Sequence, residues 1–438
     1  MKIFNVLSAL ALLIFLSACN SNQYLTKGEK KSIEQELSAA TLKDHFQGLL
    51  IYDLEGREVV YDYQGDKLFT PASNTKILTL AAAIEHLPDS LPLYEQLNAG
   101  RSIYLRGTGH PALFHPDFDT YWQEASLQLM LRGFDSLFLY HDDPKPERFG
   151  PGWAWDDYPH YYQAEKSDFP VFGNAMYVEW DSLRSEIKVF PDHLAQFSKI
   201  RLGKGTEIDL KRDEFINEFD IRVGIQTPHE TRSSIPFLME PYLISRLWEA
   251  KMNRLFFNRY EAPSGKWIPK GDFPLDTLLR KMMWESDNYL AEQILLMVGK
   301  KLTDTLKTEA AINALISDTT QIRWVDGSGL SRYNLLSPKY LVSKLEEIQS
   351  AVGWEGVYQY FPANGQKGTL KNRYTKLKQP YIYAKTGTLS NNYNLSGYIR
   401  GQSGKWYIFS YMHNHFLGSP STIQEDIEKV LLLVHQTL

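Results

Sequence analysis

Three short groups of polar residues in the sequence could together perform acyl transfer. The first is Ser73 and Lys76, an S-x-x-K pair at the start of the apolar run 77–84. On a helix, residues at i and i+3 share one face, so the lysine amine can reach the serine hydroxyl. Burial among apolar residues lowers a lysine pKa and makes the amine a usable base. The pair alone is also compatible with a helix-capping serine and a lysine that reaches water.

The other two groups follow much later in the chain. Ser286-Asp287-Asn288 lies between two helical patterns, Asp276–Glu285 and Tyr289–Lys300, and Lys385-Thr386-Gly387-Thr388 ends the alternating strand Tyr381–Ala384. Each motif alone is short and occurs by chance. S-x-x-K, S-D-N and K-T-G in this order, at a helix start, an inter-helix loop and a strand, are the signature of penicillin-recognising acyl-transferases.

The residue types match the roles that acyl transfer needs. We expect Ser73 to be the nucleophile and Lys76 the base that activates it. Ser286 can relay a proton towards the leaving amine, and Asn288 can hold the substrate amide and the lysine amine. Lys385 adds a second cation, which lowers the pKa of the first lysine further.

The strand at residues 385–388 is expected to bind the substrate. The backbone N–H groups of Ser73 and Thr388 can form an oxyanion hole, in which one donor is typically worth ~3–4 kcal/mol. The hydroxyls of Thr386 and Thr388, with the charge of Lys385, suit a terminal carboxylate. Together with Gly387, this strand offers backbone groups to an extended peptide.

The elements that must position these motifs lie at the two ends of the chain. Leu49–Asp53 and Arg57–Tyr61 read as a hairpin around a Glu55-Gly56 turn, before the Ser73 helix. The chain ends in further alternating strands and an amphipathic helix over about Ser421–Leu438. These patterns predict one sheet built from both ends of the chain, with helices packed on it.

The stretch between these ends has a different texture, with many aromatic residues, Gly, Pro and short alternating runs. We therefore expect an α/β (α+β) protein with a mainly β insertion. The predicted division is a signal peptide with lipobox over 1–19, a tether and N-terminal helix over 20–47, a catalytic domain over 48–99 plus 264–438, and inserted β-rich structure over 100–263.

Composition limits the class of protein. The 438 residues, 43% of them hydrophobic, are enough for more than one domain, and no low-complexity tract suggests a disordered scaffold. The formal net charge of −5 gives no basic footprint, so we expect no nucleic-acid partner. None of the three motifs needs a metal or cofactor, and we expect none.

The N-terminus resembles an export signal. An apolar run over 3–16 follows Lys2 and ends in Leu16-Ser17-Ala18-Cys19, where Cys19 is the only cysteine. This resembles a bacterial lipobox, in which the cysteine becomes acylated and anchors the protein to a membrane. The alternative is an ordinary cleavage site that contains a cysteine. Lipidation of this cysteine would exclude disulfides and thiolate metal sites from the mature protein.

Beyond the three motifs, the sequence resembles the D-alanyl-D-alanine carboxypeptidases/endopeptidases, the low-molecular-mass class C penicillin-binding proteins. The stretches "FTPASNTKILTLAAAI", "GPGWAWDDYP", "VDGSGLSRYNLLSP" and "YAKTGTLSNNYNLSGYI" resemble that family in the same order. Gly109-His110-Pro111 stands where the family more often has Gly-Asp-Pro. The resemblance covers about Gly48 to Met412, including the insertion.

The resemblance implies a transpeptidase fold of the penicillin-binding-protein and β-lactamase type, interrupted by β-rich domains. It implies cleavage of peptidoglycan stem peptides or cross-links through an acyl-enzyme, and acylation by β-lactam antibiotics. Asp157 in the insertion could then meet the amine of a diamino acid in the stem peptide. With the lipid anchor, these expectations place the protein in the cell envelope, facing the periplasm.

Two other classes stay open. A β-lactamase would share the acylation step, and Glu309 in "EAAIN" vaguely resembles a deacylating glutamate, although a solvated helix position is the simpler interpretation. A non-catalytic cell-wall-binding lipoprotein could use the same fold, but none of the motif residues is missing. His413 and His415 could ligate a metal, and Asp326-Gly327-Ser328-Gly329 could bind calcium or phosphate. Structural histidines and a shaped loop near the site are favoured instead.

Overall fold

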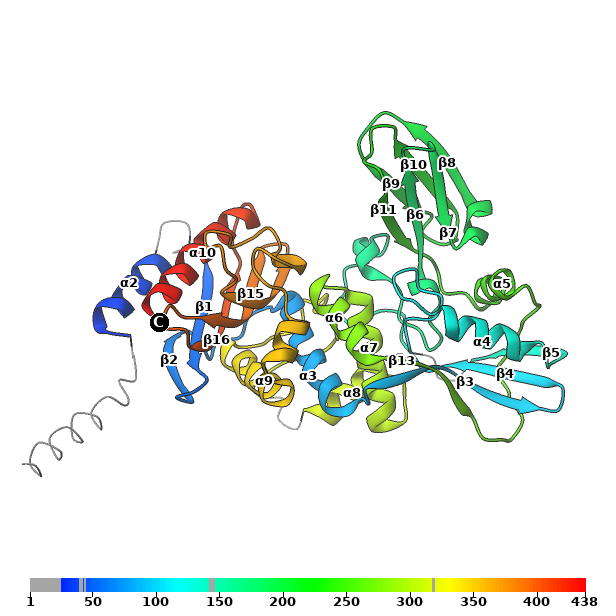
Figure 1. The fold of residues 1–438 in the computed structure, drawn as a ribbon, viewed down its shortest axis with the longest axis horizontal. Helices are drawn as coiled ribbons and strands as arrows, with labels where there is room; N and C mark the ends of the chain where they lie inside the picture. The colour runs from blue at the N-terminus through cyan, green and yellow to red at the C-terminus, as the bar shows by residue number, and fades with distance from the viewer. Residues whose placement is uncertain (1–24, 39–41, 43–44, 142–145, 317–319) are drawn as a thin grey trace, which may run out of the picture.

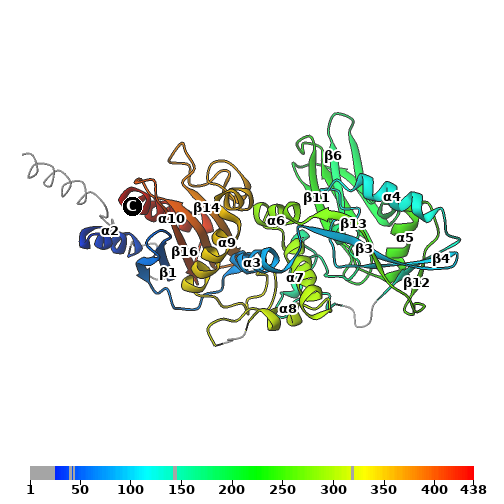
Figure 2. The same cartoon turned by 60° about the horizontal axis from the view of Figure 1, so that its bottom comes forward.

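The computed structural model describes residues 25–38, 42, 45–141, 146–316 and 320–438. The predicted signal peptide and Cys19 therefore lie outside the described residues. The molecule is elongated, with one sheet at one end and the strands of the middle of the chain at the other (Figure 1). Helices α3 (Lys76–His86), α6 (Leu275–Trp284) and α7 (Asn288–Thr303) lie between the two ends in Figure 1 and Figure 2.

The sheet at one end joins strands from both ends of the described chain. Its order is β14-β15-β16-β1-β2, and all neighbours are antiparallel. In Figure 1, β1 and β2 (blue) lie beside β15 and β16 (orange to red). The strand that carries the K-T-G motif is thus an edge strand. Residues 362–364 bond to its first half, through the Ala384 N–H to the Pro362 carbonyl and the Asn364 N–H to the Ile382 carbonyl, whereas no described strand pairs with residues 385–389 on this side. The bounds are β1 (Phe46–Asp53), β2 (Glu58–Tyr63), β14 (Ile382–Leu389), β15 (Asn392–Arg400) and β16 (Trp406–Asn414).

Helices cover both faces of this sheet because its side chains alternate. Leu49 and Ile51 of β1 enter the core beneath α2 (Lys27–Leu37) and α10 (Pro420–Thr437). Leu50 points the other way, into the core shared with α3 and α9 (Pro338–Tyr360). Because both faces are covered, β1, β15 and β16 are buried along most of their length.

The middle of the chain forms three further sheets, of order β12-β5-β4-β3-β13, β11-β6-β7 and β8-β10-β9. Because β3 pairs with both β4 and β13, the predicted boundaries at 99/100 and 263/264 fall within one sheet. The predicted division into domains stays a prediction. The elements are β3 (Ser90–Ala99), β4 (Ser102–Gly107), α4 (Tyr121–Leu131), β5 (Ser136–Tyr140), β6 (Ala175–Asp181), β7 (Glu186–Phe190), β8 (Ser198–Gly203), β9 (Ile208–Arg212), β10 (Phe219–Gly224), β11 (Thr231–Pro236), α5 (Pro241–Met252), β12 (Phe257–Arg259) and β13 (Ile268–Pro274).

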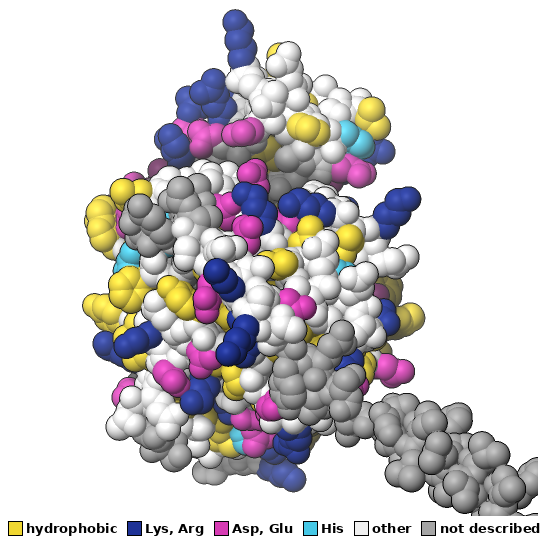
Figure 3. Space-filling view, turned by 90° about the vertical axis from the view of Figure 1, so that its left-hand side faces the viewer, with side chains coloured by type: hydrophobic (Ala, Val, Ile, Leu, Met, Phe, Trp, Pro, Cys, Tyr) yellow, Lys and Arg dark blue, Asp and Glu magenta, His cyan; other side chains and the backbone are white. Residues whose placement is uncertain are grey.

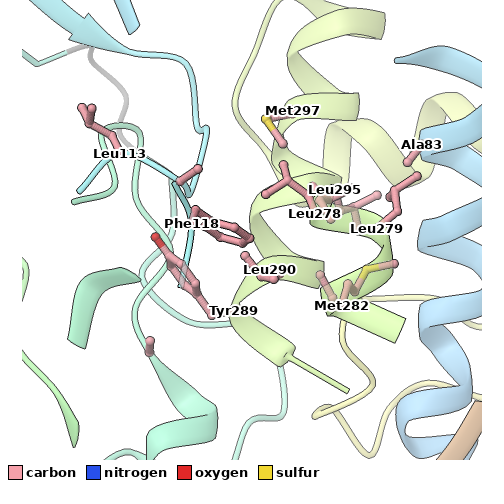
Figure 4. Close-up of a cluster of buried hydrophobic side chains, with 14 of the residues drawn as sticks. Ala83, Leu113, Phe118, Leu278, Leu279, Met282, Tyr289, Leu290, Leu295 and Met297 are labelled. Carbon is pink, nitrogen blue, oxygen red and sulfur yellow. The ribbon is translucent and has the colours of Figure 1, made fainter. Parts of the chain in front are cut away.

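The helices between the two ends share one apolar core (Figure 4). Each fully buried large apolar side chain there contributes roughly 1.5–3 kcal/mol. Helix α8 (Thr308–Leu315) packs on α7. This packing fixes α3 and α7 relative to each other, and with them the serine and asparagine of two motifs. The core includes Ala83, Leu278, Leu279, Met282, Leu290, Leu295 and Met297.

The surface seen from the sheet end carries no single-sign field. Figure 3 shows lysine and arginine side chains interspersed with aspartate and glutamate over this face. Such mixing agrees with the small net charge, and this face shows no basic patch of the kind that binds a nucleic-acid backbone. Within the described ranges, every helix is too short or too polar to cross a membrane.

Candidate active site

Ser73 and Lys76 lie where a tight turn becomes a helix. Ser73 belongs to the 3-10 turn η1 (Ala72–Thr75), and Lys76 is the first residue of α3. The lysine Nζ lies 3.0 Å from the serine Oγ, as the i, i+3 spacing predicts. The serine makes no capping bond, so the alternative of a capping serine is wrong. Lys76 is fully buried, so the alternative of a lysine that reaches water is wrong too.

The Lys76 amine has two further partners, and both are oxygen acceptors. Its Nζ donates to Asn288 Oδ1 at 2.6 Å and to the Ser328 carbonyl at 2.7 Å. A neutral amine has two N–H donors and one lone pair. Because a carbonyl oxygen can only accept, the two N–H groups are used there. The lone pair is then left for the Ser73 hydroxyl, and this is the arrangement a general base needs.

Burial and the neighbouring charges act on the protonation of Lys76 in opposite directions. Burial lowers its pKa from 10.5 to about 8, against the charges of Asp287, Asp326 and Glu292, which raise it. The three carboxylates therefore limit the shift that burial causes. The pKa of Lys385 is lowered well below its usual range, first by burial and then by the charge of Lys76.

The three residues of the S-D-N motif make different contacts. Ser286 has a positive φ of 59°, an unusual backbone conformation for a serine, in the loop between α6 and α7. Its Oγ accepts from Lys385 Nζ at 2.8 Å, so its own proton is free for another partner. Asp287 caps α7 by accepting from the Leu290 N–H at 2.9 Å. Asn288 reaches Lys76 with its oxygen and donates its amide nitrogen to the Tyr162 carbonyl at 3.0 Å.

The K-T-G motif lies within a strand and not at its end. β14 continues past the predicted end at Ala384 to Leu389, because Lys385 to Thr388 pair with Ser396 to Tyr393 of β15. Lys385 also donates to the Thr386 carbonyl at 2.8 Å, and the Thr386 hydroxyl donates to Thr369 Oγ1 at 3.0 Å. Thr388 is exposed.

Gly387 allows β14 to lie directly against η1. A Cβ at this position would come within 2.5 Å of the Pro71 carbonyl oxygen and 3.0 Å of the Asn74 nitrogen. Real Cβ atoms essentially never come that close to backbone, so a larger residue must push the strand away. The glycine therefore keeps the end of β14, with Thr388, close to the turn that carries Ser73.

The Asp326–Gly329 loop completes the site with a backbone group. Gly327 packs against the Ala291 carbonyl of α7, and a Cβ on Gly329 would clash with the Ala72 carbonyl of η1. The Asp326 carboxylate accepts four hydrogen bonds that fix this turn, from the Gly329 and Ser331 N–H groups and from the side chains of Trp153 and Asn334. Its oxygens are thus occupied, which argues against the alternative of a calcium or phosphate loop.

A cavity of about 650 Å³ opens at these motifs. One side is lined by Ser73, Ser286, Asn288, Thr386 and Thr388, whereas Lys76 and Lys385 lie buried beneath it. The opposite side comes from the middle of the chain, so the substrate space lies between the two ends of the molecule. That side includes His115, Asp157, Tyr161, Tyr177, Arg232 and Ser233.

Asp157 lines this cavity from η2 (Trp155–Asp157). Its Oδ1 accepts from the Tyr162 hydroxyl at 2.7 Å, and the pKa of that phenol is raised, first by burial and then by this carboxylate. Its neighbour Asp156 is exposed and does not line the cavity. The structure thus brings Asp157 to the same cavity as Ser73.

Other residues weighed from the sequence lie elsewhere. Glu309 is exposed and lines a different cavity from Ser73. His413 is fully buried, and burial lowers its pKa to about 3. No metal-binding group of three His, Cys, Asp or Glu is found among residues 25–438 outside the undescribed gaps. His110, the departure from Gly-Asp-Pro, accepts the Ala112 N–H at 3.2 Å and packs on Phe273.

Sequence reasoning missed the contributions of Ser328, Glu292 and Tyr162. The Asp326–Gly329 turn was recognised as a shaped loop, but a backbone carbonyl leaves no signature in residue types. Glu292, which binds the Ser328 N–H at 2.8 Å, reads in the sequence as one more helix glutamate. Its position one turn after Asn288 was the available signal.

Fold and site together define a serine-type acyl-transferase of the penicillin-binding-protein and β-lactamase fold. Penicillin binding protein 4 (dacB) from Haemophilus influenzae has the same fold, with a TM-score of 0.69 at 20% identity, covering 92% of this chain and 97% of that one. A second structure of that protein, in complex with a β-lactam, gives a TM-score of 0.66. The predicted fold class is confirmed.

The sequence identifies the family. Residues 29–201 and 270–434 match the D-Ala-D-Ala carboxypeptidase 3 (S13) family. The D-alanyl-D-alanine carboxypeptidase DacB of Haemophilus influenzae is 24% identical over 83% of this chain and 84% of its own length. The D-alanyl-D-alanine carboxypeptidase of an Actinomadura species is 28% identical over 91% and 83%. The chain belongs to this family: it is a low-molecular-mass class C penicillin-binding protein and a serine-type hydrolase.

Proposed function

We propose that this protein trims peptidoglycan by cleaving the bond after the penultimate D-alanine of a stem peptide, or the equivalent cross-link, through an acyl-enzyme on Ser73. The observation that carries the proposal is the geometry of Lys76. In the neutral amine, two acceptor oxygens bind the two N–H groups, and the lone pair is left for Ser73. The lysine Nζ lies 3.0 Å from the serine Oγ. Membership of the D-Ala-D-Ala carboxypeptidase family supplies the substrate class.

Acylation begins when the Ser73 oxygen attacks the peptide carbonyl and its proton passes to the lone pair of Lys76. The C–O bond forms, and the backbone N–H groups of Ser73 and Thr388 hold the negative oxygen. The C–N bond then breaks as the leaving amine receives the proton that Lys76 took from Ser73, relayed through the Ser286 hydroxyl, and Lys76 is neutral again. Lys385 donates to the Ser286 oxygen, which orients that hydroxyl proton away from itself.

Deacylation uses the same groups in reverse. A water molecule attacks the ester carbonyl while Lys76 takes one of its protons. The bond to the Ser73 oxygen breaks, and the serine regains a proton from the lysine ammonium. The product ends in a free D-alanine carboxylate, and the base is neutral again for the next turnover.

The carboxylate of the substrate is proposed to bind at the β14 end of the cavity. Thr386 and Thr388 line it there, with Lys385 buried beneath them, and a bound carboxylate would favour the charged form of that lysine. Asp157 on the opposite side supplies a carboxylate for the amine of a diamino acid. A cross-link places such a residue on both sides of the scissile bond, so the same cavity suits a carboxypeptidase and an endopeptidase.

The proposed setting is the cell envelope. Leu16-Ser17-Ala18-Cys19 resembles a lipobox, and acylation of Cys19 would anchor the protein to a membrane. We propose that the catalytic part faces the periplasm, where peptidoglycan lies. β-Lactam antibiotics are the proposed acylating inhibitors, because they present a reactive carbonyl next to a carboxylate, the pair that this cavity is proposed to hold.

The test is digestion of purified peptidoglycan with the protein from Asn20 onward, with products identified by mass. We expect loss of the terminal D-alanine from pentapeptide stems, conversion of cross-linked dimers to monomers, or both. A β-lactamase would leave the peptidoglycan unchanged and turn over penicillin many times. A non-catalytic binding protein would change neither, and either of these results would contradict the proposal.

A further inference from the structure

A buried carboxylate lies behind the catalytic lysine and has no role in the steps above. Glu292 lies on α7, one turn after Asn288, and only 1% of it is exposed. Its Oε1 accepts the Ser328 N–H at 2.8 Å. Its Oε2 is buried and has no hydrogen-bond partner among the described residues. A half-satisfied buried carboxylate is costly, so a purely structural position would be better filled by an amide or an apolar residue.

Glu292 binds Ser328, the residue whose carbonyl orients the Lys76 amine. The carbonyl of Ser328 accepts from Lys76 Nζ at 2.7 Å, on the other side of the same Cα from the N–H bound to Glu292. Ser328 lies between Gly327 and Gly329, and glycines leave the backbone free to rotate. Side-chain contacts are therefore needed to hold the carbonyl direction.

Contacts from three residues hold the two peptide units that meet at the Ser328 Cα. The Thr79 hydroxyl donates to the Gly327 carbonyl at 2.7 Å, and Asp326 binds the Gly329 N–H at 2.9 Å. The hydroxyl of Ser328 accepts from the Leu330 N–H at 3.3 Å. Glu292 thus holds, together with Thr79, the peptide unit that leads into Ser328, and it is the contact to this unit that comes from α7.

We infer that Glu292 is a positioning residue for acylation: it fixes the Ser328 carbonyl, which takes one N–H of Lys76 and leaves the amine lone pair directed at Ser73. This role rests on the proposed function, because it requires that Lys76 acts as the base. The site then extends from Lys76 on α3, through Ser328 in the Asp326–Gly329 loop, to Glu292 on α7.

The charge of Glu292 has a second, separable effect. The pKa of Glu292 is raised to about 6, first by burial and then by the charge of Asp326, against Lys166, which lowers it. The ionised form raises the pKa of Lys76. The charged groups that act on the lysine and on this carboxylate are Asp287 at the start of α7, Asp326 in the loop and Lys166 before β6. Lys76 in turn lowers the pKa of Lys385 on β14.

Two substitutions separate position from charge. Glu292→Gln keeps an oxygen that can accept the Ser328 N–H and removes the charge. Glu292→Leu removes both. The matched control is Glu309→Gln, which changes an exposed glutamate that lines a different cavity. The measurement is the second-order rate constant for acylation by penicillin as a function of pH, with circular dichroism to give the folded fraction.

We expect Glu292→Leu to acylate about 10- to 100-fold more slowly at all pH values, because a misdirected base loses orientation. We expect Glu292→Gln to keep most of the maximum rate, with the rising limb of its profile at lower pH than the wild-type limb near 8. That shift follows because removal of a negative charge disfavours the ammonium. The control should match the wild type.

Three results would overturn the inference. One is a wild-type rate and profile in both variants, corrected for folded fraction. Another is an equal loss in both variants without a shift of the rising limb, which is the pattern of a purely structural residue. The third is a wild-type protein that penicillin does not acylate at all; this would remove the proposed function itself, and the wild-type measurement alone reveals it.

Discussion

At the scale of single residues, the direction of one lone pair decides whether Ser73 can be activated. Lys76 has three partners, and two of them, Asn288 and the Ser328 carbonyl, cannot donate to it. A protonated lysine has no lone pair, so only the neutral form serves as the base. Burial, which lowers the lysine pKa, and the two acceptors, which orient the amine, therefore act on the same step.

The protonation state of Lys76 gives a pH prediction with a definite sign. Because its pKa is lowered to about 8, the neutral amine is the minor form at pH 7, roughly a tenth of the molecules. Acylation should rise about tenfold per pH unit below that value and level off above it. The measurement is the acylation rate with a penicillin between pH 5.5 and 9. A rate that falls as pH rises through 8 would contradict the role of the base.

Removal of the amine should separate chemistry from binding. Lys76→Ala should slow acylation by about 10²- to 10⁴-fold, because the general base is lost. Non-covalent affinity for a slowly reacting β-lactam should change little, since Lys76 is buried beneath the cavity and does not line it. Stopped-flow measurements give both quantities. Equal loss of affinity and rate would show that the lysine acts mainly in binding.

Lys385 should behave differently from Lys76. Its amine binds Ser286 Oγ at 2.8 Å, and its charge serves the substrate carboxylate in the proposed mechanism. Lys385→Ala should therefore weaken both the binding and the acylation of penicillin. The same two-parameter measurement applies, and an effect confined to one parameter would argue against the double role.

At the scale of elements, the site depends on how closely β14 approaches η1. Gly387→Ala would place a Cβ within 2.5 Å of the Pro71 carbonyl oxygen, so the strand must move away from the serine turn. We expect acylation to fall at least tenfold and stability to fall by about 1–3 kcal/mol. The matched control is Gly28→Ala in α2, where a Cβ meets only ordinary contacts. This control should leave acylation unchanged and not reduce stability.

Gly387→Ala can be checked by urea unfolding and penicillin acylation on the same preparation. Wild-type acylation with normal stability would mean that the approach of β14 to η1 is not needed. A loss of stability with full activity in the folded fraction would confine the glycine to a structural role.

The elements also show what sequence can and cannot predict. The spacing of Ser73 and Lys76 predicted their contact because helix geometry is local. The three motifs were placed on a helix start, an inter-helix loop and a strand, but β14 was expected to end at Ala384. Lysine and glycine in K-T-G-T weaken a strand pattern, whereas pairing with β15 extends it. Long-range pairing of this kind overrides local preference.

Backbone groups were beyond prediction for a different reason. The Ser328 and Tyr162 carbonyls bind Lys76 and Asn288, yet any residue type supplies a carbonyl. Only the three-dimensional fold places them. The role of Glu292 depends on the path of a loop more than thirty residues later in the chain, which no helical pattern around it reveals.

At the scale of the whole molecule, the cavity joins two parts of the chain that fold around different sheets. The residues proposed to carry out acylation lie on the side with Ser73, whereas Asp157 lines the opposite side. Substitutions there should change substrate preference and leave the acylation machinery intact.

Asp157→Asn tests this division. We expect a higher KM for a stem peptide that contains a diamino acid, by about 10-fold, because a charge-assisted contact to its amine is lost. Acylation by penicillin G, which has no such amine, should be unchanged. Asp156→Asn, at the exposed neighbouring position, is the control and should change neither. Equal effects on both substrates would contradict the proposed role in recognising the diamino acid.

Anchoring is a second property of the whole molecule. Wild-type protein expressed with its own N-terminus should partition with membranes, whereas Cys19→Ser should lose the acyl group and its membrane association. Metabolic labelling with a fatty-acid analogue measures this directly. Equal labelling of the two forms would reject the lipobox.

The central claim is that Ser73 is the nucleophile that forms the acyl-enzyme. Its most direct test is mass spectrometry of the protein after brief treatment with penicillin, followed by proteolysis and mapping of the adduct. We predict a mass increase of one penicillin on the peptide that contains Ser73, and none in Ser73→Ala. An adduct on any other residue, or an equal adduct in Ser73→Ala, would contradict the claim.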